Sequence, residues 1–260
     1  MSEVIIINIL FTVIFAALGA CIASFANVVA IRSATDESFI KGRSRCPACS
    51  GTLKWFELIP IISWLIQKGK CRSCKVSLSP RYLIVEILGA AALSLSFVKF
   101  WFSWSLLIAF SVFVVLLLIG LIDFTTMEIP DVLIVILLPF AIAAIWVQPE
   151  ITLLSRGIGL LTISVPMLIL ALIIKGAFGG GDIKLMAVIG VLLGWQGVLF
   201  AFFVAVVIAG SIALTLIIRK KAKKGAQMAF GPYLCIGTMT AFIYGNEIMT
   251  WYFGLYGLWL

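Results

Sequence analysis

The sequence predicts an all-helical, polytopic membrane protein with about eight membrane-spanning helices and a small zinc-binding insert on the cytosolic side. Apolar residues make up 63% of the 260 positions and charged residues only 12%, and the mean hydropathy is +1.22. Soluble domains are far less apolar than this. The chain also contains no histidine, which excludes a Ser-His-Asp triad, a Cys-His pair and a histidine-ligated catalytic zinc.

Apolar segments of about the length needed to cross a bilayer recur along the chain. The candidates are Val4–Val29, Tyr82–Val98, Trp104–Ile122, Val132–Val147, Leu153–Ile174, Leu185–Leu193, Val198–Ile218 and Gly231–Gly245. The first begins after Glu3 with no basic region before it, so it is expected to stay as a helix and not to be removed as a signal peptide. The sixth is too short for a regular span. Because it follows a run of glycines, a broken or re-entrant helix is expected there.

The basic residues predict the orientation of these spans. With the amino terminus outside, the cytosolic segments hold 17 of the 19 Lys and Arg residues, and only Lys99 and Arg156 lie outside. This asymmetry follows the positive-inside rule. It places Asp123 and Asp182 on the same, cytosolic side of the membrane.

Four cysteines form two CxxC pairs in the polar segment after the first span. They are Cys46, Cys49, Cys71 and Cys74, with 21 residues between the two pairs. Two such pairs supply the four thiolates of a tetrahedral zinc site, which is structural because no position stays open for water. Disulfides are the alternative, but a cytosolic segment favours thiolates. The predicted division is therefore a first helix at residues 1–31, a zinc-binding domain at 32–81 and a membrane core at 82–260.

Asp182 is the most informative single residue, because it follows Gly179-Gly180-Gly181 between two apolar segments. A carboxylate at membrane depth is costly and therefore usually faces water, a partner or a substrate. The glycines would let another backbone approach closely, or they serve close helix packing. Asp123 is similar, since it lies at the end of an apolar segment. Asn27, by contrast, is expected to make a hydrogen bond between helices.

A pair formed by Asp123 and Asp182 would support general acid/base catalysis. Two close carboxylates resist double ionisation, so one remains protonated while the other acts as a base. Together they would activate water against an amide carbonyl and protonate the leaving amine. Paired acids also occur in proton-coupled carriers, so transport stays open as an alternative. A third possibility is a non-catalytic assembly scaffold.

Several segments, taken in order, resemble the prepilin (type IV leader) peptidases, a family within the GxGD class of intramembrane aspartyl proteases. The segments are Ser24-Phe25-Ala26-Asn27-Val28-Val29, Arg45-Cys46-Pro47-Ala48-Cys49, Glu57-Leu58-Ile59-Pro60, Gly69-Lys70-Cys71-Arg72-Ser73-Cys74, Asp123 with Ile129-Pro130-Asp131, Gly179-Gly180-Gly181-Asp182-Ile183-Lys184 and Phe230-Gly231-Pro232-Tyr233. No single motif is specific, but the ordered set is. The resemblance covers nearly the whole chain.

The resemblance implies a function and its residues. It implies removal of the basic leader from type IV prepilins and pilin-like proteins, with Asp123 and Asp182 as the catalytic pair. Gly179, Gly181 and Lys184 would form the motif at which the substrate approaches. Relatives that carry the cysteine-bearing domain commonly also methylate the new amino terminus with S-adenosylmethionine. No segment matches a methyl-donor pocket, so the cofactor-binding residues stay unknown.

The same resemblance implies where the protein acts and what it meets. The location is the bacterial cytoplasmic membrane, with the active site facing the cytosol. The expected partners are prepilin or pseudopilin precursors of a type IV pilus or secretion system, and the anionic membrane surface. No nucleic acid is expected as a partner, because the positive charge is explained by topology.

Overall fold

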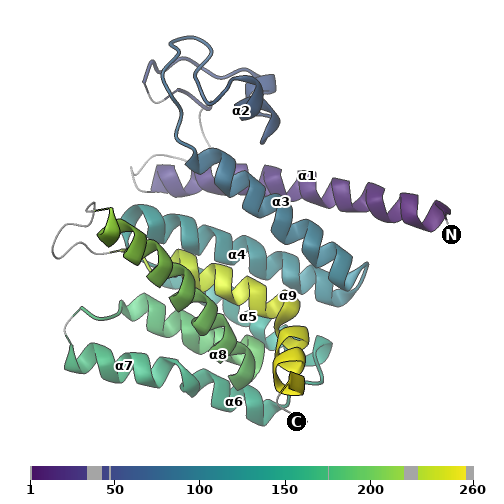
Figure 1. Cartoon of the computed structure of the whole chain (residues 1–260), viewed down its shortest axis with the longest axis vertical. Coiled ribbons are helices and arrows are strands. Elements are labelled where there is room, and N and C mark those ends of the chain that lie inside the picture. The colour runs from purple at the N-terminus through teal and green to yellow at the C-terminus, as the bar shows by residue number, and fades with distance from the viewer. Residues whose placement is uncertain (1, 34–42, 47, 175, 220–227, 256–260) are drawn as a thin grey trace. The chain divides into compact units, whose positions relative to one another are not determined.

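The computed structural model describes residues 2–33, 43–46, 48–174, 176–219 and 228–255 (Figure 1). Its regular elements are helices, and within these residues the only β-type pairing is two isolated bridges. The predicted all-helical class is therefore confirmed. Several basic residues used to predict the orientation, Lys41, Lys175 and the run at 220–224, lie outside the described residues.

The chain divides into two compact units, Met1–Phe102 and Ser103–Leu260. The described residues of the first, here called unit 1, form four helical elements: α1 (Ser2–Ser33), the short helices η1 (Trp55–Leu58) and α2 (Ile62–Ile66), and α3 (Arg81–Phe100). Helices α1 and α3 pack against each other (Figure 1). A Cβ atom at Gly19 would overlap the backbone of Gly89, so glycine at this position allows the two backbones to touch.

In the second unit, called unit 2, the part of the chain that the structure describes forms six helices: α4 (Trp104–Thr126), α5 (Asp131–Val147), α6 (Leu153–Thr162), α7 (Ser164–Ile173), α8 (Gly180–Ile218) and α9 (Gly231–Leu255). Helix α8 contacts α5, α6, α7 and α9. Its closest approaches again involve small residues, because Gly190 meets Gly159 of α6 and Ala201 meets Gly237 of α9. Helix α8 therefore organises the packing of this unit.

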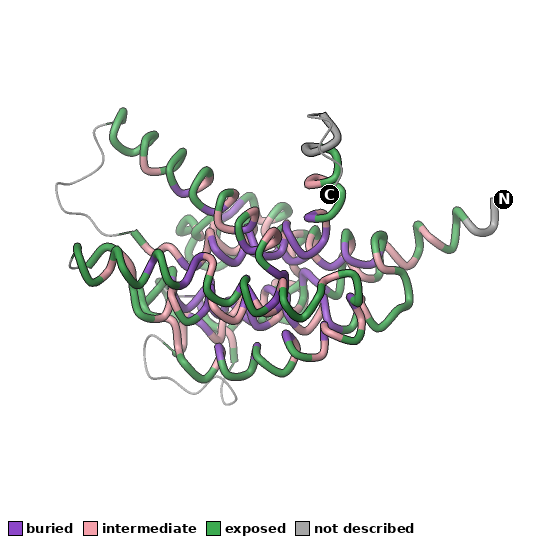
Figure 2. Tube along the Cα trace, turned by 90° about the horizontal axis from the view of Figure 1, so that it is seen from below, coloured by how far each residue is buried: buried purple, intermediate pink, exposed green. Residues whose placement is uncertain are grey.

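Five helical segments of the described residues are long and apolar enough to cross a membrane: Ile5–Ser33, Arg81–Phe100, Trp104–Thr126, Leu153–Ile173 and Gly180–Ile218. Helix α5 is equally apolar but has 17 residues. Many large apolar side chains are exposed along these helices, such as Val135 at 66% and Leu172 at 76%. Figure 2 shows these exposed positions in green beside buried positions in purple. Exposed apolar surface of this extent is what lipid tails cover.

The break in the sixth predicted span lies in a different place from the one expected. The glycine run does not interrupt a helix but precedes one, because Gly179 is the N-cap of α8. The sixth and seventh predicted segments are both part of α8, and the helix is broken between them at Gly194, whose φ is 70° and ψ is 177°. The break therefore sits at a single glycine with a positive φ, where an L side chain is disfavoured.

Arg156, which the sequence places near the outer end of the Leu153–Ile174 segment, is buried. It lies in α6 and is only 2% exposed. Its guanidinium donates hydrogen bonds to the carbonyl oxygens of Ile151, Val191, Leu192, Ala144 and Gln148 at 2.8–3.3 Å. The charge is therefore solvated by backbone groups instead of by water.

Candidate active site and metal centre

Asp123 occupies the last turn of α4 and is 5% exposed. Its Oδ2 accepts a hydrogen bond of 2.9 Å from the backbone N–H of Gly231, the first residue of α9. A Cβ at position 231 would lie 2.7 Å from this oxygen, which leaves room only for glycine. The carboxylate is thus fixed by a residue that lies 108 positions later in the chain.

Asp182 lies in the first turn of α8, where the helix dipole favours a negative charge. Its Oδ2 accepts a hydrogen bond of 3.2 Å from the N–H of Gly179. Its Oδ1 is buried and has no hydrogen-bond partner among the described residues. The carboxylates of Asp123 and Asp182 lie close enough for their charges to repel each other. The thiol of Cys235 lies within electrostatic range of both carboxylates. The structure therefore brings Asp123 and Asp182 together.

The glycine motif packs against the connection between α4 and α5. A Cβ at Gly181 would lie 2.8 Å from the Cβ of Ile129, so this side of the motif is already occupied by a residue of the chain. At Gly180 a Cβ would meet no atom within 4 Å. Lys184 forms an ion pair of 2.8 Å with Asp131, and both side chains are more than half exposed. The approach of a substrate along Gly179, Gly181 and Lys184 stays a prediction.

The carboxylate of Asp123 thus depends on a glycine that the sequence reasoning did not select as a site residue. Gly231 precedes Pro232, and proline is favoured in the first turn of a helix, where N–H groups have no helical acceptor. The Gly-Pro pair is therefore typical of the start of a helix, where the N–H of the glycine has no acceptor within the helix. The sequence does not show which acceptor that N–H meets, because Asp123 reaches it only through tertiary packing.

The four predicted metal ligands of unit 1 come together. The Sγ atoms of Cys46, Cys49, Cys71 and Cys74 all lie within 4.8 Å of one another, and those of Cys46 and Cys74 are 3.9 Å apart. A tetrahedral zinc with Zn–S bonds of about 2.3 Å places its sulfurs roughly 3.8 Å apart. The donor set and its spacing therefore fit zinc. All four are free cysteines in the structure.

The two CxxC turns have the same backbone hydrogen bonds. Cys46 donates to Gly51 O at 3.0 Å, and Cys71 donates to Val76 O at 2.9 Å. In each turn the residue four positions after the first cysteine, Ser50 or Lys75, donates to that cysteine's carbonyl and has a positive φ. The sequence showed no repeat beyond the cysteine spacing, but the structure contains the same metal-binding turn twice.

Backbone donors also act on the ligands themselves. The N–H groups of Cys49 and Ala48 point at the sulfur of Cys46 and lower the pKa of its thiol to about 7. A thiolate is the form that binds zinc. The backbone donors of this turn therefore favour the thiolate form of Cys46.

Asn27 corrects another expectation from the sequence. Its side chain is 1% exposed in α1, but neither amide atom has a hydrogen-bond partner among the described residues. The expected hydrogen bond between helices is therefore absent from the described part of the chain.

Unit 2 thus defines a class: a helical membrane protein with two aspartates at helix ends, within electrostatic range of each other. Residues 109–214 match the model of the type IV leader peptidase family, and residues 17–100 match that of the bacterial peptidase A24 N-terminal domain. No solved structure matches the chain.

The chain is similar to several curated proteins named prepilin leader peptidase/N-methyltransferase. That of Bacillus subtilis (strain 168) is 34% identical over 238 residues, which cover 90% of this chain and 94% of the relative. That of Stutzerimonas stutzeri is 33% identical, with 80% of this chain and 74% of the relative covered. That of Dichelobacter nodosus is 35% identical over 79% of this chain and 72% of the relative. The chain belongs to the type IV leader peptidase family.

Proposed function

We propose that this protein is a membrane endopeptidase that removes the leader peptide of type IV prepilins and pilin-like proteins and then methylates the new amino terminus. Family membership and the names of the relatives support both activities. The observation that carries the peptidase proposal is the meeting of Asp123 and Asp182, contributed by α4 and α8. A carrier with the same acids is not favoured by these relatives.

In the proposed mechanism the two aspartates share one proton. The ionised carboxylate removes a proton from the attacking water, and the protonated carboxyl donates a hydrogen bond to the carbonyl oxygen of the scissile amide. The leaving amine then takes a proton from the aspartate pair, which returns to its starting state with one shared proton. The Gly231 N–H holds Asp123 in a fixed orientation, so the pair does not have to reorganise during the reaction.

Two cofactors belong to this proposal. One structural zinc ion would be bound by Cys46, Cys49, Cys71 and Cys74. It would stabilise a segment that is too small to form a hydrophobic core of its own. S-adenosylmethionine would supply the methyl group, because its sulfonium gives a methyl carbon to a neutral amine and becomes a thioether.

The proposed setting is the bacterial cytoplasmic membrane, with the amino terminus outside and the aspartates toward the cytosol. The distribution of Lys and Arg supports this orientation. The substrates would be prepilin or pseudopilin precursors, whose basic leaders would lie among anionic lipid headgroups.

The experiment is a single substitution, Asp123→Asn or Asp182→Asn, assayed by cleavage of a prepilin in membranes that contain the variant. We expect processing to fall at least about a hundredfold in each, because an amide cannot act as a general base. Glu150→Gln serves as the control, since Glu150 lies exposed in the turn between α5 and α6. Wild-type processing by either Asn variant, at equal protein levels, would rule out the acid pair.

A further inference from the structure

Unit 1 contains a cavity of about 700 Å³ next to the cysteine turns. Its walls come from three sources: Ser24 and Val28 of α1, Tyr82 and Glu86 of α3, and the segment between these helices. Small-molecule pockets commonly measure roughly 300–1,000 Å³. The cavity therefore has the size of a cofactor site, and every residue that lines it belongs to unit 1.

Glu86 gives the cavity a buried negative charge. The residue is 7% exposed, and its Oε2 accepts a hydrogen bond of 2.7 Å from the N–H of Ile61. Among the described residues no basic side chain forms an ion pair with it. A buried carboxylate without a counter-ion is costly, and a cationic ligand would remove that cost. A second carboxylate, that of Glu57, also lines the cavity.

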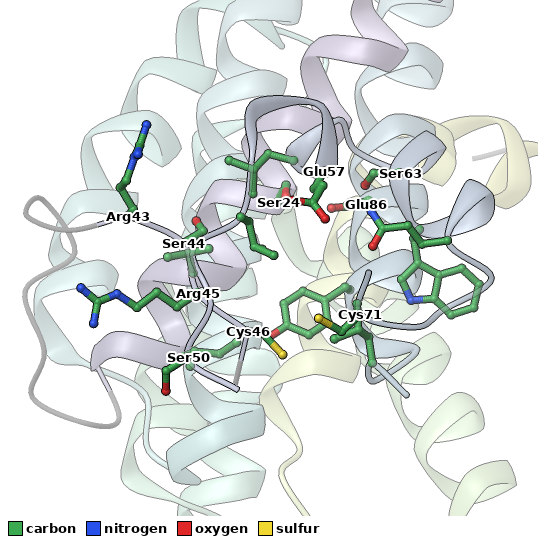
Figure 3. A pocket seen from close by; sticks show the side chains of 18 of the residues that line it. Ser24, Arg43, Ser44, Arg45, Cys46, Ser50, Glu57, Ser63, Cys71 and Glu86 are labelled. Carbon is green, nitrogen blue, oxygen red and sulfur yellow. The ribbon is translucent and has the colours of Figure 1, made fainter. Parts of the chain in front are cut away.

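The positive charges of the cavity lie elsewhere on its wall. Three arginines line it: Arg32 at the end of α1, which is half-buried, and Arg43 and Arg45, which are exposed. Figure 3 shows Arg43 and Arg45 on one side of the view and Glu57, Glu86 and Ser63 on the other. Separated acidic and basic groups of this kind match a ligand that carries a cation and a carboxylate at different points.

Hydrogen-bonding groups that lack partners point to the same region. Trp64 lines the cavity, and its indole Nε1 is buried without a hydrogen-bond partner in the described residues. Asn27, next to the lining residue Val28 in α1, also has both amide atoms unpaired but does not itself line the cavity. Buried polar groups are rarely left unsatisfied, so the unpaired donor of Trp64 in the cavity wall indicates a polar ligand.

We propose that this cavity is the binding site for S-adenosylmethionine. The carboxylate of Glu86 faces the sulfonium cation, the guanidinium groups of Arg43 and Arg45 bind the ligand's carboxylate, and Trp64 contributes an aromatic face and a hydrogen-bond donor. The proposal rests on the methylation proposed above. It also gives the zinc site a purpose, because the two buried ligands, Cys46 and Cys71, form part of the cavity wall.

The charge of the ligand provides a direct test. S-adenosylmethionine is a sulfonium, whereas S-adenosylhomocysteine is a neutral thioether of almost the same shape. The binding of both would be measured by equilibrium dialysis with the full-length, zinc-loaded protein in lipid nanodiscs. Glu86→Gln keeps an acceptor oxygen for Ile61 N–H and removes the charge, so the fold is preserved. The matched control is Glu150→Gln in unit 2.

We expect Glu86→Gln to weaken binding of S-adenosylmethionine at least about tenfold, and binding of S-adenosylhomocysteine by less than about threefold. Glu150→Gln should change neither. Equal effects of Glu86→Gln on both ligands, or no effect on either, would overturn the assignment of the sulfonium to Glu86. Zinc content, measured on the same samples, reports whether each variant is folded.

The location of the proposed S-adenosylmethionine site can be tested without any substitution. Ultraviolet crosslinking of radiolabelled S-adenosylmethionine, followed by peptide mapping, should label residues within 24–86, and excess S-adenosylhomocysteine should abolish the label. Label elsewhere, or none, overturns the cavity as the site. A parallel assay of methyl transfer to a pilin cleaved beforehand separates the two proposals. Methyl transfer to the pilin without crosslinking of the cavity residues would overturn only the proposed binding site. If no methyl group is transferred, the proposed methylation activity is itself overturned.

Discussion

At the scale of single residues, Arg156 shows how backbone carbonyl groups stabilise a buried cation, with Glu150 in electrostatic range as its acidic neighbour. Two of its acceptors, Val191 and Leu192, lie just before the break at Gly194, where the helical acceptor pattern is interrupted. Two others, Ala144 and Gln148, lie at the carboxyl end of α5. Both sites lie at or near the carboxyl end of a helical segment, where the dipole is negative. The carbonyls of Ala144 and Gln148 also accept backbone N–H groups, so Arg156 binds to their second lone pairs. One guanidinium therefore caps two helical segments.

Arg156→Lys should destabilise the protein although the charge is kept. An ammonium has three donors on a flexible stem and cannot serve five acceptors in the geometry of the guanidinium. We expect a loss of about 2–5 kcal/mol, measured by thermal or denaturant unfolding in detergent. Arg219→Lys, at an exposed position after α8, is the control. Equal stability of the two variants would contradict the capping role of Arg156.

At the scale of elements, α8 carries a candidate catalytic residue in its first turn and has a break in its helical geometry farther along. Its first turn carries Asp182, and its break at Gly194 lies beside Ser155 of α6. A Cβ at position 194 would lie 2.6 Å from the Ser155 hydroxyl oxygen. The break is thus held in place by α6 packing and by the backbone contacts of Arg156.

Gly194→Ala should therefore cost stability through both backbone strain and the clash with Ser155. We expect a decrease of about 1–3 kcal/mol in the free energy of unfolding. Gly210→Ala on the same helix is the matched control, because a Cβ there would meet no atom within 4 Å. That control should be neutral or slightly stabilising. A Gly194→Ala variant as stable as Gly210→Ala would show that the break is not required.

At the scale of the whole molecule, the metal site and the acid pair belong to different compact units. Removing zinc should therefore loosen residues 43–78 while the helices of unit 2 stay folded, because no cysteine ligand lies beyond residue 102. Limited proteolysis after treatment with a chelator should cut within 43–78 and spare 104–218. Cys46→Ser with Cys71→Ser should lower the zinc content measured by mass spectrometry. Full metal content in that variant would contradict the four-thiolate site.

The sequence predicted those features whose signal is local. The CxxC pairs specify their own turns, and Asp123 and Asp182 stand out because charges interrupt apolar segments. The roles of Gly194, Arg156 and Gly231 were not predicted, because each depends on a partner that packing brings near. These partners are Ser155, the backbone carbonyls of α5 and α8, and the carboxylate of Asp123. The burial of Asn27 without a partner is likewise a tertiary property.

The two proposed reactions use residues of different compact units, because the aspartates lie beyond residue 102 and the residues that line the cavity lie before it. Their order follows from the chemistry, since the amine to be methylated does not exist until the peptide bond is cut. Under these proposals the methylation step can fail while cleavage still delivers its product.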